Sequence, residues 1–144
     1  MNLEKIQSMW EADSHIDMDN LHDESIKVPQ LHQKYHTLYT TIKLLLLRSE
    51  ELYNKTRLER HNYYTGRAPA EVYVEDPFPY RVKEKDNIQL HLAADEKLSK
   101  AKMKVEYNKV MLEALEDILK MIHARGYQIK NSVDYLKFLS GMGL

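Results

Sequence analysis

Two long series of apolar residues dominate the chain, and both have the spacing of an amphipathic helix. The first series advances in alternating steps of four and three residues, which places its members on one face of a helix. The pattern predicts a helix that begins near Pro29 and ends before Gly66 and Pro69. Such a helix, of roughly 35 residues, is about 50 Å long. Its face consists of Leu31, Tyr35, Leu38, Ile42, Leu45, Ser49 and Leu52, with Ser49 the one polar break.

The second series predicts another long helix from Ala94 to Arg125, and Gly126 is expected to end it. Its face consists of Leu98, Ala101, Val105, Asn108, Leu112, Leu115, Leu119 and Ile122. Asn108 is either a buried polar group that sets the register and the number of subunits or a partly exposed one.

Two apolar faces of this length are too large for a 17 kDa monomer to bury. We therefore expect a closed homo-oligomer built mainly by residues 94–139. The residues expected to form the subunit contacts are Leu98, Val105, Asn108, Leu112, Leu115, Leu119 and Ile122.

The remaining sequence predicts only short elements. The pattern favours short helices over residues 2–12, from Asp17 or Asp19 to Ile26, and over 131–139. Residues 68–92 are expected to be an extended connector, with a pair of short strands at 71–74 and 88–92 as the alternative. The fold class is thus a mainly α single domain of residues 1–144. Its regions are acidic helices over 1–29, a long helix over 30–67, the connector, and oligomerisation helices over 93–144.

Composition excludes several classes of protein. With four Gly and four Pro in 144 residues, a β-sandwich with many turns is not expected. The lack of Cys excludes disulfides, thiolate catalysis and Cys-ligated zinc. Without a long apolar run, we expect neither a signal peptide nor a membrane span.

The net charge of −1 conceals a block pattern along the chain. The blocks 1–29, 30–67, 68–96 and 97–144 carry net charges of −5, +4, −4 and +4. A local field can therefore be strong although the total charge is near zero, and the alternation also suits contacts between subunits.

A basic and aromatic stripe lies at the end of the first predicted helix. Its members, with spacings of four and three, are Tyr53, Arg57, Arg60, Tyr64 and Arg67. Guanidinium groups can hold phosphates and flat rings can stack on unpaired bases, so the stripe suits single-stranded nucleic acid. The other interpretation is a solvated helix end whose tyrosines cover a neighbouring helix.

Motifs for catalysis or metal binding are not found. His32 and His36 have the spacing of two metal ligands on a helix, but neither a zinc-protease motif nor a third ligand accompanies them. Phosphate-binding glycine loops and nucleophile elbows are missing as well. We therefore expect a binding and assembly protein with no cofactor. A structural coiled-coil protein without a nucleic-acid role is the alternative, and a small enzyme is a third, weaker one.

Four short motifs resemble one family, the UvsY recombination mediator proteins of T-even-type bacteriophages. Leu3-Glu4-Lys5-Ile6-Gln7 followed by Ile16-Asp17 is similar to the N-terminus of the family, and Tyr63-Tyr64-Thr65-Gly66-Arg67 to the end of its basic motif. Leu92-Ala93-Ala94-Asp95 and Arg125-Gly126-Tyr127-Gln128-Ile129-Lys130 resemble two motifs of its C-terminal part. The motifs occur in the family's order and spacing, in a chain of matching length.

The resemblance implies a ring of six or seven subunits that binds single-stranded DNA. It implies two partners besides DNA, a RecA-like phage recombinase and the phage single-stranded-DNA-binding protein that the recombinase replaces. The work would take place in the cytoplasm of the infected bacterial host.

One position departs from the family's basic motif. The family has a Lys two residues before the Arg that corresponds to Arg60, and this chain has Leu58 there. Arg57 is the neighbouring basic residue, about 100° around the helix. The residues expected to contact DNA are Lys55, Arg57, Arg60, His61, Tyr63, Tyr64 and Arg67, with arginines on phosphates and tyrosines on bases.

Overall fold

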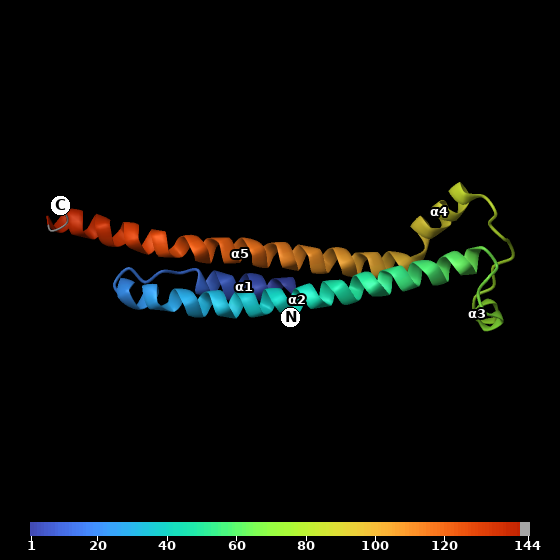
Figure 1. Cartoon of the computed structure of the whole chain (residues 1–144), viewed down its shortest axis with the longest axis horizontal. Helices are drawn as coiled ribbons and strands as arrows, with labels where there is room; N and C mark the ends of the chain where they lie inside the picture. The colour runs from blue at the N-terminus through green and yellow to red at the C-terminus, as the bar shows by residue number, and fades with distance from the viewer. Residues whose placement is uncertain (142–144) are drawn as a thin grey trace. The chain divides into compact units, whose positions relative to one another are not determined.

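The computed structural model describes residues 1–141, and within them the chain forms five α-helices (Figure 1). They are α1 (Leu3–Asp13), α2 (Leu21–Tyr64), α3 (Ala70–Glu75), α4 (Lys85–Ala94) and α5 (Glu96–Ser140). No strand occurs among the described residues. The mainly α fold with two long helices is therefore confirmed. Residues 142–144, the end of the predicted C-terminal region, lie outside the described residues.

The first long helix starts earlier than expected. The sequence predicted a short helix that ends at Ile26 and a second helix that starts near Pro29. The structure has one continuous helix, α2, with Pro29 inside it. Its first turn is closed by the Glu24 amide, which donates to the Asn20 carbonyl at 3.0 Å. Leu21 and Tyr35 are buried on either side of Pro29. Packing on both sides keeps the helix continuous although proline removes one backbone hydrogen bond.

The second long helix ends later than expected. Gly126 does not stop α5, which continues to Ser140 and includes the predicted short C-terminal helix. Ile122 and Ile129 are buried on either side of Gly126, two turns apart on one face. Continuous packing of this face outweighs the roughly 1 kcal/mol by which glycine disfavours a helix.

The connector is neither extended throughout nor a pair of strands. Residues 71–74 belong to α3 and 88–92 to α4, so the strand alternative is wrong. Ile88 and Leu92 are both buried, and their spacing of four is that of one helical face. A period of four, and not of two, therefore describes this segment.

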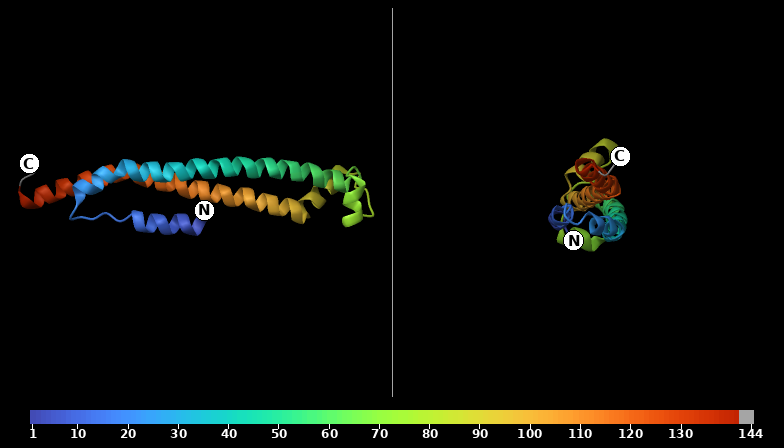
Figure 2. Two further views of the ribbon diagram at one scale, coloured as in Figure 1. Left: turned by 90° about the horizontal axis from the view of Figure 1, so that it is seen from below. Right: turned by 90° about the vertical axis from the view of Figure 1, so that its left-hand side faces the viewer.

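The chain divides into two compact units, each described by itself. The first unit joins Met1–Lys43 with the chain from Val110 onward. Its core gathers apolar side chains from α1, α2 and α5, which lie side by side (Figure 2). The core residues are Ile6, Tyr35, Ile42, Met111, Leu115, Ile118 and Ile122.

A buried ion pair ties the loop after α1 to this first unit. The Arg125 guanidinium donates to Glu24 Oε2 at 2.7 Å and to the carbonyls of Ser14 and His15 at 3.1 and 2.9 Å. Arg125 and Glu24 are both buried. Arg125 therefore joins α2, α5 and the loop between α1 and α2, and the predicted helix-ending residue is instead a core residue.

The second unit comprises Leu44–Lys109. Ile88, Leu92 and Leu98 form its apolar cluster. The Asn108 side-chain amide donates to Ser49 Oγ at 3.1 Å, and both residues are buried. The polar breaks of the two predicted apolar faces thus satisfy each other within one chain.

Candidate nucleic-acid interface

Arg60, the central cation of the predicted stripe, is buried. Only 7% of its surface is exposed, and its Nε donates to Asp95 Oδ2 at 2.7 Å. Its guanidinium lies over the Tyr63 ring at 4.1 Å from the centroid, with a second, longer ion pair to Asp76 at 3.8 Å. The charge of Arg60 is therefore paired with carboxylates inside the unit, and its role in DNA binding stays a prediction.

Asp95 is the acceptor around which this end of α2 is organised. Its Oδ2 also accepts from the Tyr64 hydroxyl at 2.6 Å, and its Oδ1 caps α5 by accepting from the Leu98 amide at 2.8 Å. Burial alone would raise the pKa of the Asp95 carboxyl. The hydrogen bonds from Tyr64, Leu98 and Arg60, together with the charge of Arg60, instead hold that pKa below its ordinary value.

The rings of Tyr63 and Tyr64 are covered by other rings. Tyr63 is 3% exposed and stacks on Tyr73, with centroids 5.4 Å apart. Tyr64 stacks on His91, with ring centroids 5.0 Å apart. Burial, and to a smaller extent the hydrogen bond to Asp95, raises the pKa of the Tyr64 hydroxyl. Both tyrosines thus pack against neighbouring segments of the chain, as in the interpretation of the stripe in which its tyrosines cover a neighbouring helix.

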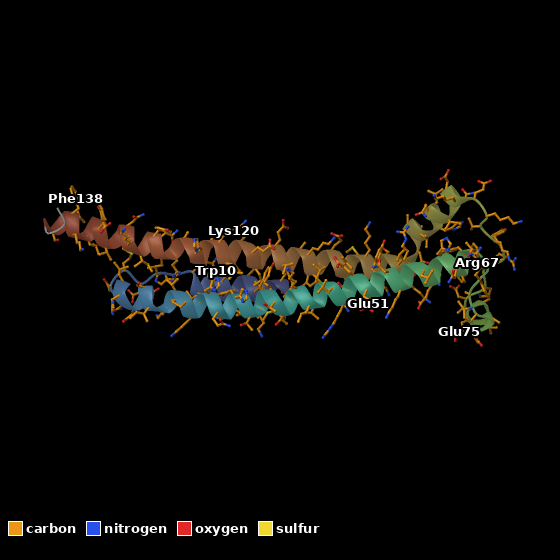
Figure 3. All side chains as sticks on the ribbon, viewed as in Figure 1. Trp10, Glu51, Arg67, Glu75, Lys120 and Phe138 are labelled. Carbon is orange, nitrogen blue, oxygen red and sulfur yellow. The ribbon has the colours of Figure 1, made fainter. Side chains whose placement is uncertain are left out.

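The other predicted contact residues keep their polar groups accessible. Arg57 is exposed and donates to Gln89 Oε1 at 3.2 Å, and Lys55 pairs with Glu51 at 3.2 Å on the surface of α2. His61 is half-buried near the end of α2. Arg67 is exposed just beyond that end, beside the connector (Figure 3). The structure thus separates these four side chains from the buried Arg60, Tyr63 and Tyr64.

Two basic residues that the sequence analysis did not select, Arg81 and Lys83, lie next to this group. They line one surface hollow together with His61 and Arg67. Their segment belongs to the block 68–96, whose net charge is negative. The net charge of the block therefore gave no indication of a local basic group. The alternation of basic and apolar residues from Tyr80 to Lys83 is the signal that could have identified them.

The residues expected to join subunits are covered largely by their own chain. Leu115 and Ile122 belong to the core of the first unit, and Leu112 and Leu119 pack against it, half-buried. In the second unit Leu98, Val105 and Asn108 are buried. The helices cover most of the apolar faces that the sequence analysis assigned to a partner subunit, and the subunit contacts stay a prediction.

The two histidines with metal-ligand spacing contact each other. His32 and His36 stack on each other with ring centroids 5.7 Å apart. In residues 1–141, no group of three or more His, Cys, Asp or Glu is placed to hold a metal ion. Within the same range, none of the helices has the length and apolar character needed to cross a membrane.

Comparison with known proteins identifies relatives by both sequence and structure. The family described as "Recombination, repair and ssDNA binding protein UvsY" matches residues 9–142. No curated protein sequence matches the chain.

Among solved structures, the chain is similar to the recombination mediator protein UvsY of bacteriophage T4. One crystal form has a TM-score of 0.84 at 27% identity, covering 97% of this chain and 98% of that chain. A second form gives 0.82 at 26% identity, covering 96% and 98%. Because the family match spans nearly the whole described sequence, the chain belongs to the UvsY family of recombination, repair and single-stranded-DNA-binding proteins.

Proposed function

We propose that this protein is a recombination mediator. It binds single-stranded DNA and promotes loading of a RecA-like recombinase in place of the phage single-stranded-DNA-binding protein, in the cytoplasm of the infected host. The observation that carries the proposal is the family match over residues 9–142, supported by the likeness to the T4 mediator over 98% of that protein's chain. Recombination, repair and recombination-dependent replication are the processes served.

The proposed DNA contacts are the accessible members of the predicted set: Lys55, Arg57, His61 and Arg67. Their side chains can hold phosphates without breaking an internal buried ion pair. The buried members of the predicted set have a structural role in this proposal, because their polar groups bind Asp95 and the connector. They are Arg60, Tyr63 and Tyr64. Arg57 takes over the positive charge that the family motif has at the position of Leu58.

The proposed assembly is a closed ring of six or seven subunits. The support is an apolar surface that the chain itself leaves uncovered near the end of α5. Its exposed side chains are Tyr127, Tyr135, Leu136, Phe138 and Leu139. Apolar groups this numerous on one helix are typical of an interface. Repeating the basic surface once per subunit increases the strength of binding to a long strand through effective concentration.

A binding experiment with a matched control tests the DNA function. Fluorescence anisotropy of labelled oligothymidylate should show tighter binding than to a duplex of equal length. Arg57→Ala should weaken binding, whereas Arg48→Ala, which removes the same charge from an exposed site elsewhere on α2, should not. Equal binding of single strand and duplex, or no binding at all, would favour a structural coiled-coil protein instead.

The loading step needs a separate measurement. DNA is first coated with the phage single-stranded-DNA-binding protein, and the time to recombinase filament formation is then recorded with and without this protein. We expect the delay to shorten with wild type and to lengthen again with Arg57→Ala. A delay that does not change on adding wild type would contradict the mediator role while leaving DNA binding intact.

A further inference from the structure

We propose that the surface hollow around Gly66 binds a backbone phosphate of single-stranded DNA, with Arg67, Arg81 and Lys83 as its cationic wall and His61 beside them. This inference rests on the proposed function and adds to it a specific site and two new contact residues. The hollow has a volume of about 420 Å³.

The charge of the hollow favours an anion. Arg67, Arg81 and Lys83 carry fixed positive charge, and His61 adds a ring nitrogen. No Asp or Glu belongs to its lining, and none of the four side chains pairs with a carboxylate of another described residue. This contrasts with Arg60, whose charge Asp95 neutralises. Unpaired arginines in a concave surface suit the forked hydrogen bonding of a phosphate.

Backbone hydrogen bonds hold the two segments of the hollow together. The Val82 amide donates to the Tyr64 carbonyl at 2.9 Å, which fixes the connector to the end of α2. Val82 packs against the apolar cluster of the second unit, while its neighbours Arg81 and Lys83 are exposed. The Arg67 amide donates to the Asn62 carbonyl at 2.8 Å. The cationic wall is therefore positioned by main chain on both sides.

Gly66 is necessary for the position of Arg81. Its φ of +79° lies in the left-handed region, which residues with a Cβ rarely adopt. A Cβ built at Gly66 would stand 2.6 Å from Arg81 Nε and 3.0 Å from Arg81 Cγ. The absence of a side chain thus lets the Arg81 side chain lie close against the turn that follows α2.

An exposed aromatic ring adjoins the cationic wall. Tyr80 directly precedes Arg81, is 71% exposed and meets Phe78 edge to face at 5.9 Å. In contrast to Tyr63 and Tyr64, most of its ring surface remains open. A base next to the bound phosphate can stack there, as bases do in single-strand binding. Phosphate and base contacts would then come from neighbouring residues of one segment.

Replacing Arg81 tests the assignment. Affinity of Arg81→Ala for labelled oligothymidylate is measured at several salt concentrations beside Lys85→Ala, which removes one charge from the same segment but outside the hollow. We expect Arg81→Ala to bind about tenfold more weakly and Lys85→Ala to bind as wild type. The slope of log affinity against log salt should become shallower by about 0.7 for each copy of Arg81 that contacts the strand.

The outcomes separate this inference from the proposed function. If wild type fails to bind single strands, the proposed function is wrong. If wild type binds and both variants bind alike, the hollow is not the site. Inorganic phosphate should displace the strand from wild type more effectively than chloride at equal ionic strength, because it offers the same oxygens to the arginines. An equal effect of phosphate and chloride on wild type would overturn the assignment. Far-ultraviolet circular dichroism of each variant checks that the fold is unchanged.

Discussion

At the scale of single residues, burial decides what a basic side chain can do. Arg60 and Arg57 are three positions apart on α2, yet Arg60 pairs with Asp95 in the interior and Arg57 is exposed. The two residues share one helical face by their spacing, but only Arg60 lies where Asp95 and Asp76 pair with it. We therefore expect that any loss of DNA binding on mutation of Arg60 would have a structural cause.

Removal of Arg60 should destabilise the fold. Arg60→Ala leaves Asp95 buried without its cationic partner, which costs about 3–5 kcal/mol. Arg57→Ala, at an exposed site, should change the free energy of unfolding by no more than about 0.5 kcal/mol. Urea denaturation followed by circular dichroism measures both. Equal stability of Arg60→Ala and wild type would mean that Arg60 is free for DNA.

Stability should also depend on acid through Asp95. Its pKa is lowered in the folded state, since the hydrogen bonds and the charge of Arg60 outweigh the effect of burial. The carboxylate therefore contributes stability above its unfolded pKa of about 3.9, and this contribution is lost as pH falls through the folded pKa. We expect the free energy of unfolding to fall as the pH drops from neutral through and below this unfolded pKa.

The matched variant for this pH dependence is Asp95→Asn, which cannot titrate. Its free energy of unfolding should fall less over the same pH range than that of wild type. Asp86→Asn, at an exposed carboxyl of α4, serves as the control and should keep the wild-type dependence. An unchanged dependence in Asp95→Asn would assign the acid sensitivity to another group, such as the buried Glu24.

At the scale of elements, continuous packing outweighs local signals for helix ends. Pro29 and Gly126 are both residues at which a helix commonly starts or stops, and both lie inside long helices. The positions that do end α2 combine a glycine in the left-handed conformation with a chain that turns back to the helix. A local signal is thus decisive only where no buried face continues beyond it.

Gly126 therefore offers a stabilising substitution. A Cβ at this position would meet no atom within 4 Å, and its φ is not positive. Gly126→Ala should raise the free energy of unfolding by roughly 0.5–1 kcal/mol, because alanine favours the helix. Gly66→Ala is the matched opposite and should lower it, because the φ of +79° at this position strains a residue with a Cβ. Thermal unfolding of the two variants would contradict this view if their effects were reversed.

At the scale of the whole molecule, the proposed function depends on copies of the chain acting together. A single subunit would offer few phosphate contacts, and the proposed ring would multiply them along one strand. The predicted contact residues Leu115 and Ile122 are fully used inside the subunit. Exposed apolar groups near the end of α5 are the better candidates for contacts between subunits.

Two substitutions on α5 should separate assembly from folding. Phe138→Asp, at a side chain that is 63% exposed, should reduce the oligomer mass in light scattering while helicity is retained. Leu115→Asp, at a side chain that is 0% exposed, should unfold the chain because it places an unpaired charge in the core. An oligomer of wild-type mass in Phe138→Asp would direct the search for the interface to another part of the surface.

The sequence by itself determined the helical class, the two long elements and the family. Apolar spacing of three and four is a local property, and it survives in any packing that buries one face. The four short motifs identified the family without knowledge of the fold, because a motif depends only on the identity and order of its residues.

Tertiary structure decided which side chains of the stripe are free. Arg60 and Asp95 are 35 positions apart in the chain, and no local rule pairs them. The same holds for Ser49 and Asn108, whose two polar interruptions become one buried hydrogen bond. Arg81 joined the basic hollow only because the Val82 amide binds the end of α2. Contacts between distant segments depend on how the chain folds back. Residue spacing along one helix therefore could not predict which side chains form the site.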